Sequence, residues 1–118
     1  MTIKSYKDLF VWQKGIDLVD AIYKIAALLP KQEQYILVSQ MLRAAISIPS
    51  NIAEGYRRRH KAEYIQFLSI ALASAAELET QLIITKKQYP QTNYEHAEIL
   101  AEEVQKMLYA LILKVKNN

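Results

Sequence analysis

The sequence predicts an all-α protein: an antiparallel up-down-up-down four-helix bundle whose second helix is kinked near Pro49. The chain of 118 residues contains only 2 glycines and 3 prolines, and such a composition favours helix over strand. Apolar residues also recur at alternating spacings of three and four, the period of helices that pack against one another. A chain of this length forms one core, so we expect residues 1–118 to be a single domain.

The first helix is expected over residues 7–29. Ser5 is suited to be its N-cap, with Asp8 three residues later, and Pro30 ends it. The apolar stripe expected to face the core is Leu9, Trp12, Ile16, Val19, Tyr23 and Ala26.

The second helix is expected over residues 32–57, with Val38, Met41, Ala45, Ile48 and Ile52 facing the core. Pro49 lies inside this helix, lacks an N–H for the carbonyl of Ala45 and crowds that turn, so we expect a kink there. Gly55 is expected to end or weaken the helix, because glycine adopts a left-handed backbone without penalty.

The third and fourth helices are expected over residues 60–88 and 93–115, separated by the polar loop Tyr89-Pro90-Gln91-Thr92-Asn93. Thr92 or Asn93 is the expected N-cap of the fourth helix. The expected core stripes are Tyr64, Leu68, Ala71, Ala75, Leu78 and Leu82, and then Ala97, Leu100, Val104, Met107 or Leu108, Leu111 and Val115.

Apolar residues also lie outside these stripes on the first, third and fourth helices. A monomeric bundle needs one stripe per helix, so a second stripe predicts a further buried face and therefore a homo-oligomer. These additional residues are Val11, Ile22, Ile25, Leu28, Ile65, Ile70, Ile83, Ile84, Ile99 and Ile112.

The sequence offers no constellation for catalysis or for a metal. It has no cysteine, which excludes disulfides, thiolate metal sites and cysteine nucleophiles. A di-iron bundle needs Glu-x-x-His, but His60 follows Arg57 and His96 follows Asn93 at that spacing. The Arg57–His60 spacing is also shorter than the arginine–histidine pair of some helical ribonucleases. We therefore predict no enzyme activity, no catalytic residue, no metal and no cofactor.

Location in the cell is predicted from the absence of membrane or export signals. No signal-peptide core follows the first lysines, and no apolar run reaches the roughly 20 residues that span a bilayer. We expect a soluble cytoplasmic protein that does not bind membranes.

The basic residues gather at the end of the second helix. The net charge of +3 is modest, but Arg57, Arg58, Arg59 and Lys61 stand almost side by side. Adjacent arginines at a helix end cannot all pair with neighbours, and guanidinium groups bind phosphate oxygens bidentately. These four residues and Tyr56 are the candidate nucleic-acid-binding residues, and Tyr56, Tyr64 and Tyr6 could stack on bases. The alternative is a solubilising turn without a partner.

A second group of polar residues lies close to the stripes of the second and third helices: Gln40, Arg43, Asn51, Glu54, Ser74 and Glu77. Buried polar groups are nearly always paired, so we interpret the group as a structural network that fixes helix register, with Arg43 paired to Glu77. The alternative is an internal recognition site for a base or a peptide.

The order of these features resembles a known family. The residues that carry the resemblance are Asp8-Leu9, Val11-Trp12-Gln13, Pro30, Glu33, Tyr35, Gln40, the run SIPSNIAEG from Ser47 to Gly55, Arg58, the run from Tyr64 to Leu68, Ala71, Ser74 and the run from Glu77 to Leu82. Over nearly the whole chain they resemble the four-helix bundle proteins encoded in intervening sequences of bacterial 23S ribosomal RNA genes. One departure is Ala73, where the family usually has glycine.

The resemblance implies a four-helix bundle that assembles into a ring-like homo-oligomer, commonly a pentamer, and it implies no known catalytic activity. The family is similar in fold to accessory proteins of diversity-generating retroelements, basic rings that bind nucleic acid and a reverse transcriptase. The leading hypothesis is a non-enzymatic oligomeric scaffold that binds structured RNA or DNA through the arginines. The rival is a purely structural or protein-interacting module, whose protein partner the sequence does not identify. A hydrolase with an unrecognised site is a third hypothesis.

Overall fold

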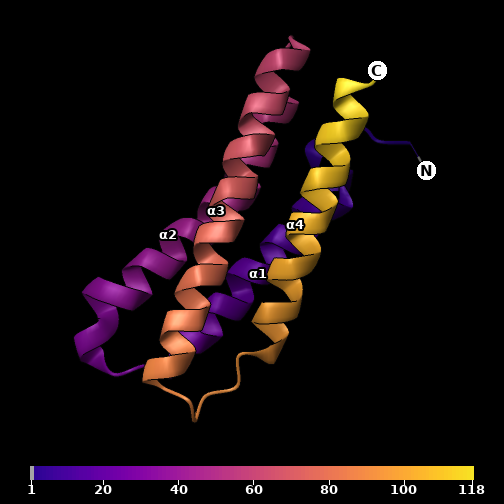
Figure 1. The fold of residues 1–118 in the computed structure, drawn as a ribbon. Helices are drawn as coiled ribbons and strands as arrows, with labels where there is room; N and C mark the ends of the chain where they lie inside the picture. Colours follow the sequence, from indigo (N-terminus) through magenta and orange to yellow (C-terminus); the bar gives the residue numbers. More distant parts are fainter. Residues whose placement is uncertain (1) are drawn as a thin grey trace.

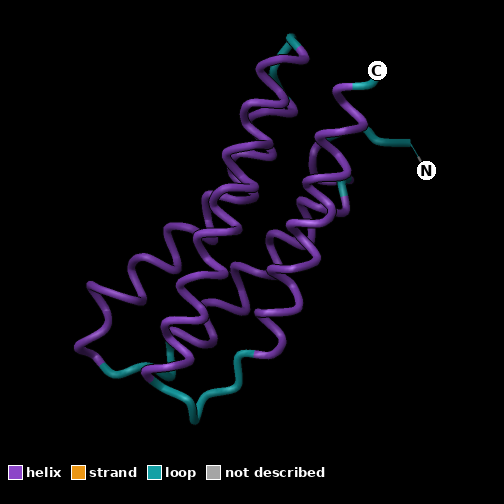
Figure 2. The backbone as a smooth tube through the Cα atoms, in the orientation of Figure 1, coloured by secondary structure: helices purple, strands orange, loops and turns teal. Residues whose placement is uncertain are grey.

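The structure, a computed structural model, describes residues 2–118 and contains four α-helices (Figure 1). Helix α1 spans Phe10–Ala26, α2 spans Ser39–Tyr56, α3 spans Lys61–Gln88 and α4 spans Glu95–Lys116. Short helical turns precede α1 and α2, and no strand occurs among these residues. The predicted all-α four-helix class is confirmed, and Figure 2 shows that the loops are confined to the ends of the bundle.

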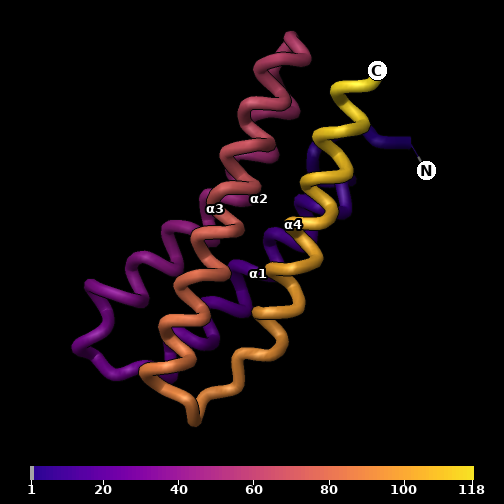
Figure 3. The backbone as a smooth tube through the Cα atoms, viewed as in Figure 1, coloured from indigo at the N-terminus to yellow at the C-terminus, as the bar shows by residue number. Residues whose placement is uncertain are grey.

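Successive helices run in alternating directions (Figure 3). Contacts between residues far apart in sequence agree, because Met41 at the start of α2 meets Thr85 at the end of α3, and Lys61 at the start of α3 reaches Asn118 after α4. Each of α1 and α3 packs against both α2 and α4. Helices α1 and α3 are therefore diagonal partners, and the bundle measures 46 × 25 × 19 Å.

The chain enters the bundle through a capped turn. The Ser5 side chain accepts from the Lys7 N–H, and Asp8 accepts from the Ser5 N–H at 3.2 Å, so the predicted capping box forms. It closes a 3-10 turn, Tyr6–Asp8, and α1 begins only at Phe10. The helix expected over residues 7–29 is therefore shorter at both ends.

The core-facing stripe of α1 differs from the prediction. The buried residues of α1 are Val11, Gly15, Leu18, Ala21, Ile22 and Ile25. Ile16 and Tyr23, which were expected inside, are exposed, and Trp12 and Val19 are only partly buried. Both stripes have helical spacing, and the one richer in small and branched aliphatic residues packs inside.

Between α1 and α2 the chain forms a 3-10 turn, Lys31–Glu33, and a π-helical segment, Gln34–Val38. Helix α2 then continues through Pro49 without interruption, so the kink expected there stays a prediction. Gly15 of α1 lies opposite Pro49: a Cβ on Gly15 would be 3.5 Å from two Pro49 side-chain atoms. A methyl group at Gly15 would therefore make ordinary van der Waals contact with the proline ring.

Gly55 has a different role from the one expected. It lies inside α2 and is buried, and no glycine has a positive φ in the described residues. A Cβ there would stand 2.7 Å from the Phe67 Cβ and 3.1 Å from Tyr64 Cδ1. At Gly55 the backbone of α2 lies close against α3, and the lack of a side chain permits that contact.

Tyr94 holds the α3–α4 connection in place. It is only 2% exposed, and its hydroxyl donates to the Tyr89 carbonyl at 2.8 Å. Tyr89 in turn donates to Glu33 Oε2 at 2.6 Å, which ties this connection to the turn before α2. The Asn93 side chain accepts from the Glu95 N–H at 2.9 Å, so one of the two predicted capping residues does bond at the start of α4.

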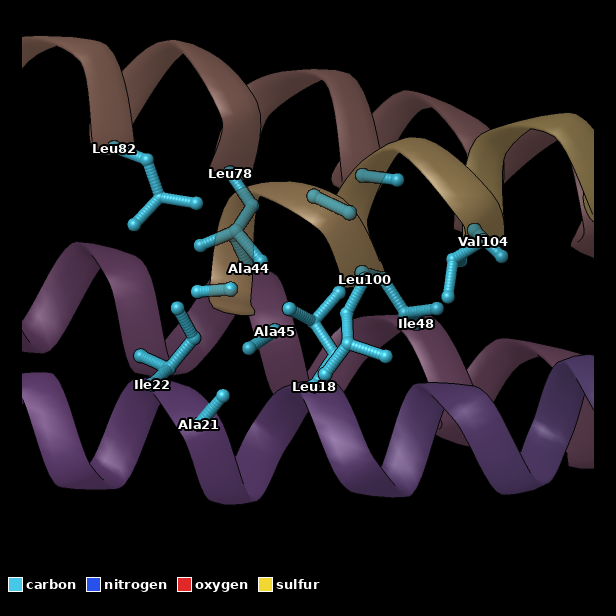
Figure 4. Close-up of a cluster of buried hydrophobic side chains, with 14 of the residues drawn as sticks. Leu18, Ala21, Ile22, Ala44, Ala45, Ile48, Leu78, Leu82, Leu100 and Val104 are labelled. Atoms are coloured by element: carbon cyan, nitrogen blue, oxygen red, sulfur yellow. The ribbon is translucent and has the colours of Figure 1, made fainter. Parts of the chain in front are cut away.

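One apolar core runs through the bundle (Figure 4). The close-up shows Leu18 and Ile22 of α1 meeting Ala45 and Ile48 of α2, with Leu78, Leu82, Leu100 and Val104 supplied by α3 and α4. In α2 and α3 the predicted stripes are buried apart from their first residues, Val38 and Tyr64, which are partly exposed.

Several large apolar residues remain on the surface. Ile16 and Tyr23 of α1 belong to the stripe beside α2, and Ile46 of α2 is also exposed; Ile70, Ile83 and Ile84 occupy the outer face of α3. Of the additional apolar residues noted in the sequence, Val11, Ile22, Ile25 and Ile112 are core residues instead, and Ile65 is partly buried. Leu28 and Ile99 of that set are exposed too, as are Tyr109 and Leu113 of α4, so every helix of the bundle carries exposed apolar residues.

Two helical stretches, Lys31–Tyr56 and Lys61–Gln88, are long and apolar enough to cross a membrane by length and composition. The sequence was expected to contain no such run. Both stretches supply core residues of the bundle, and helices of a soluble core meet the same criterion. The cytoplasmic location stays a prediction.

Candidate nucleic-acid interface

The predicted basic residues lie together at one end of the bundle. Helix α2 ends at Tyr56 and α3 begins at Lys61, so the basic loop, defined as Arg57 to Lys61, is the connection at the top of Figure 1. The Arg58 N–H donates to the Gly55 carbonyl at 3.0 Å. All five residues of the basic loop are exposed.

Arg58 is held by two neighbours. Its Nη2 donates to Glu54 Oε2 at 2.8 Å, and its guanidinium carbon lies 4.7 Å from the centre of the Phe67 ring. The ion pair spans one helical turn, and the ring adds a cation–π contact. Both partners sit on helices, so the Arg58 guanidinium has a defined position.

Arg57 packs on the entry turn of the chain. Its guanidinium carbon lies 5.7 Å from the centre of the Tyr6 ring, and Tyr6 meets Trp12 edge-on with ring centres 5.5 Å apart. Arg57 has no carboxylate partner among residues 2–118. Its charge is therefore positioned by an aromatic face and is not neutralised by an ion pair.

The remaining basic side chains face solvent. Lys61 donates to the backbone oxygen of Asn118 at 2.7 Å. Within the described part of the chain, the Arg59 guanidinium makes no hydrogen bond or ion pair, so its five N–H donors are open to a ligand.

Two hollows flank the basic loop. The first hollow, of about 460 Å³, is lined by Tyr6, Ser50, Ala53, Glu54, Arg57 and Arg58. The second hollow, of about 280 Å³, is lined by Arg58, Arg59, His60, Lys61, Tyr64, Val115 and Asn118. Arg58 lines both, so it separates them.

The tyrosines near the basic loop pack against other aromatic rings. Tyr56 and Tyr64 meet edge to face, with ring centres 6.1 Å apart and planes at 87°. Burial raises the pKa of the Tyr64 hydroxyl, and the nearby Tyr56 adds to this effect. The hydroxyl therefore stays protonated at neutral pH and adds no negative charge to the second hollow.

A comparison with models of protein families shows to which family the chain belongs. The model of the family described as 23S rRNA-intervening sequence protein matches residues 7–110. The chain belongs to this family. A solved structure similar to it is a protein of unknown function from the S23 ribosomal protein family of Bacteroides thetaiotaomicron, with 28% sequence identity and a TM-score of 0.78. The similarity covers 86% of this chain and 97% of that one. No curated protein matches.

In this member of the 23S rRNA-intervening sequence protein family, the predicted polar network is smaller than expected. Ser47 Oγ and Ser74 Oγ are 2.8 Å apart, and Asn51 Nδ2 donates to the Ser47 carbonyl at 2.8 Å and to Ser47 Oγ at 2.9 Å. Asn51 and Ser74 thus join a network that links α2 to α3. Its centre is Ser47.

The other four predicted members lie outside that network. Gln40, Arg43, Glu54 and Glu77 are exposed, and Arg43 and Glu77 form no ion pair in the region from residue 2 to 118. The prediction was wrong for them because their neighbours Met41, Ala44, Ala45 and Leu78 occupy the inward positions. Glu54 instead pairs with Arg58, a contact that the four-residue spacing of opposite charges could have indicated.

The sequence interpretation also missed Phe67 as a partner of Arg58. The only signal for this contact in the sequence was that Phe67 is an aromatic residue in the first turns of the third helix, close to the end of the second. No group of three potential metal-ligating side chains occurs in the residues that the structure describes.

Proposed function

We propose that this chain is the subunit of a cytoplasmic, non-enzymatic homo-oligomeric scaffold that binds structured RNA or DNA through its basic loop. The observation that carries the proposal is the concentration of unneutralised positive charge there. Only Arg58 has a carboxylate partner among the basic residues of the loop, as far as residues 2–118 are concerned. Exposed guanidinium groups bind phosphate oxygens bidentately.

Assembly into a ring is supported by two of the exposed apolar surfaces. One lies along α1 and α2 with Ile16, Tyr23 and Ile46, and the other on the outer face of α3 with Ile83 and Ile84. Because α1 and α3 are diagonal partners, one subunit would offer two different faces to its neighbours. Unlike faces give head-to-tail contacts, which form a ring when the rotation between neighbours closes and a filament when it does not. A ring-like pentamer is the form proposed here.

A ring would multiply the charge of the loop. Rotational symmetry places equivalent points of all subunits in one plane, so every basic loop would lie on the same side of the ring. Each phosphate contact adds to the release of bound counterions. Several modest patches would then bind a nucleic acid that one patch binds weakly.

The test is the salt dependence of binding to a structured RNA hairpin and a DNA duplex, measured by fluorescence anisotropy. We expect the triple variant Arg57→Ala, Arg58→Ala, Arg59→Ala to bind more weakly and to lose about 0.7 to 0.9 of the log–log salt slope for each contact removed. The charge-matched control replaces Lys24, Lys31 and Lys87, which lie toward the other end of the bundle, with alanine.

Equal binding by the parent and the triple variant would show that the basic loop is not the interface. An oligomer that binds neither RNA nor DNA would favour the rival function, a structural module whose apolar surfaces serve assembly or an unidentified protein partner.

A further inference from the structure

We propose that the basic loop recognises consecutive phosphates of a nucleic-acid backbone in two subsites, the first and second hollows, without stacking on bases. Arg58 is the positioning residue between the subsites. The inference rests on the proposed function and specifies what that interface reads.

The two subsites follow from how the basic side chains are distributed. Arg57 lines the first hollow only, whereas Arg59 and Lys61 line the second only. Arg58 lines both hollows, but its guanidinium already binds Glu54 at 2.8 Å and lies against Phe67. Arg58, which is paired with Glu54, thus lies between Arg57 in one hollow and the unpaired basic side chains in the other. A ligand that reaches both hollows needs anionic groups repeated along a chain.

The aromatic residues argue against base stacking. Binding of unpaired bases relies on aromatic faces that are free to receive them. Tyr6 already carries the Arg57 guanidinium and contacts Trp12, while Tyr64 is partly buried against Tyr56. The Phe67 ring carries the Arg58 guanidinium. The rings near the loop hold arginines in place, which leaves the backbone of the nucleic acid as the part that is recognised.

The position of Arg58 has a separate consequence. If it mainly positions the loop, removing the charge of Glu54 frees Arg58 from its partner and weakens the arrangement of both subsites. If Arg58 were itself a phosphate ligand, the same change would free its charge and tighten binding. Glu54 also lines the first hollow, so Glu54→Gln lessens the repulsion of phosphate in either case. Only a salt slope steeper by about one contact marks Arg58 as a phosphate ligand.

The decisive experiment compares a single-stranded oligodeoxynucleotide with an abasic strand of the same length, which keeps the sugar–phosphate backbone and lacks the bases. We expect affinities within about threefold of each other, whereas stacking of even one base would cost roughly tenfold. Tyr6→Leu and Tyr64→Leu should likewise change affinity by less than about threefold. Circular dichroism melting checks that each variant is folded.

The subsites are tested by charge removal. Arg57→Ala and Arg59→Ala should each lower the salt slope by about one contact, and the double variant should lower it by about two. Glu54→Gln should leave the salt slope unchanged, because no phosphate contact is added. An RNA duplex of equal length shows whether a double-stranded backbone is also accepted.

Two outcomes would overturn the inference while leaving the proposed function intact: an abasic strand that binds at least tenfold more weakly, or a Glu54→Gln variant whose salt slope is steeper by about one contact. If no nucleic acid binds the parent protein, the proposed function itself fails.

Discussion

Two glycines lie at close helix contacts, yet they respond differently to an added methyl group. At Gly55 a Cβ would stand 2.7 Å from the Phe67 Cβ, and at Gly15 the nearest atoms would be 3.5 Å away. The first distance requires α2 and α3 to separate, because carbon atoms make contact at 3.5 to 4.0 Å. The second is ordinary van der Waals contact.

We therefore expect Gly55→Ala to lower the free energy of unfolding by about 1–3 kcal/mol through overpacking. Gly15→Ala serves as the matched control and should be neutral or stabilising by up to about 1 kcal/mol, because alanine is the better helix former. Urea unfolding at a fixed protein concentration measures both. A Gly55→Ala protein as stable as the parent would mean that α3 shifts without cost.

Tyr89 and Tyr94, at the connection between α3 and α4, predict how the stability of the fold changes at alkaline pH. Burial raises the pKa of the Tyr94 hydroxyl, and the hydrogen bond to Glu33, followed by burial, raises the pKa of Tyr89. An unfolded tyrosine ionises near pH 10, whereas these two stay protonated to higher pH in the folded chain. Their contribution to stability is complete below about pH 10 and is lost as the pH rises toward the folded pKa.

The variant Tyr94→Phe tests whether stability falls as the pH rises above the pKa of an unfolded tyrosine. It should be less stable than the parent by about 1 kcal/mol at pH 8, because the bond to the Tyr89 carbonyl is lost. The difference should shrink above about pH 10, since phenylalanine has no proton to release. Unfolding free energies measured at several pH values give the comparison. A difference that stays constant to about pH 11 would contradict the assignment to Tyr94.

At the scale of the helices, the small network of Ser47, Asn51 and Ser74 joins α2 to α3. Ser74 is almost fully buried, and its hydroxyl bonds only to Ser47 within residues 2–118. Ser74→Ala should therefore cost about 1 kcal/mol of unfolding free energy. Ser69→Ala, an exposed position on the same helix, should change it by less than about 0.5 kcal/mol. Equal melting temperatures for the two variants would show that the network does not stabilise the fold.

Helix α1 shows what the sequence leaves undetermined at this scale. The helix was predictable from its period and its cap, but two apolar stripes share that period, one through Leu18 and Ile22 and one through Ile16 and Tyr23. Which stripe faces inward depends on how α2 and α4 pack against α1, and that packing brings Gly15 opposite Pro49 of α2. Spacing within one helix contains no information about the partner helix, so the sequence could not show which stripe of α1 faces the core.

The candidate site was predictable in location but not in detail. The run of arginines after Gly55 indicated an exposed basic segment, and the structure places it at the bundle end. The contacts of Arg57 with Tyr6 and of Arg58 with Phe67 join residues from different elements. They depend on the antiparallel packing, which brings the entry turn and the first turns of α3 beside the end of α2.

For the whole molecule, the outer face of α3 predicts assembly. Ile83 is 53% exposed and Ile84 is 44% exposed, and neighbouring exposed apolar side chains favour a protein–protein contact. We expect light scattering at micromolar concentration to give a mass near that of a pentamer of the 13.6 kDa chain. Ile83→Glu with Ile84→Glu should reduce the mass without loss of helix, because carboxylates cannot be buried unpaired.

The control for this prediction places glutamate at Gln88 and Gln91, which are exposed polar positions near the end of α3. It should keep the parent mass. A parent protein that is monomeric would exclude the proposed ring. An unchanged mass for the variant with both isoleucines replaced would show that the interface does not include this part of α3.

The even number of antiparallel helices has a practical consequence for experiments on this protein. Both ends of the described chain lie at the same end of the bundle as the basic loop (Figure 1), and Asn118 contacts Lys61 directly. A purification tag at either end would stand beside the arginines, where an acidic tag would compete with a ligand. The connection between α3 and α4 lies at the far end. Since the sequence has no cysteine, Gln91→Cys would provide a single attachment point for a fluorophore, well separated from the surface to be measured.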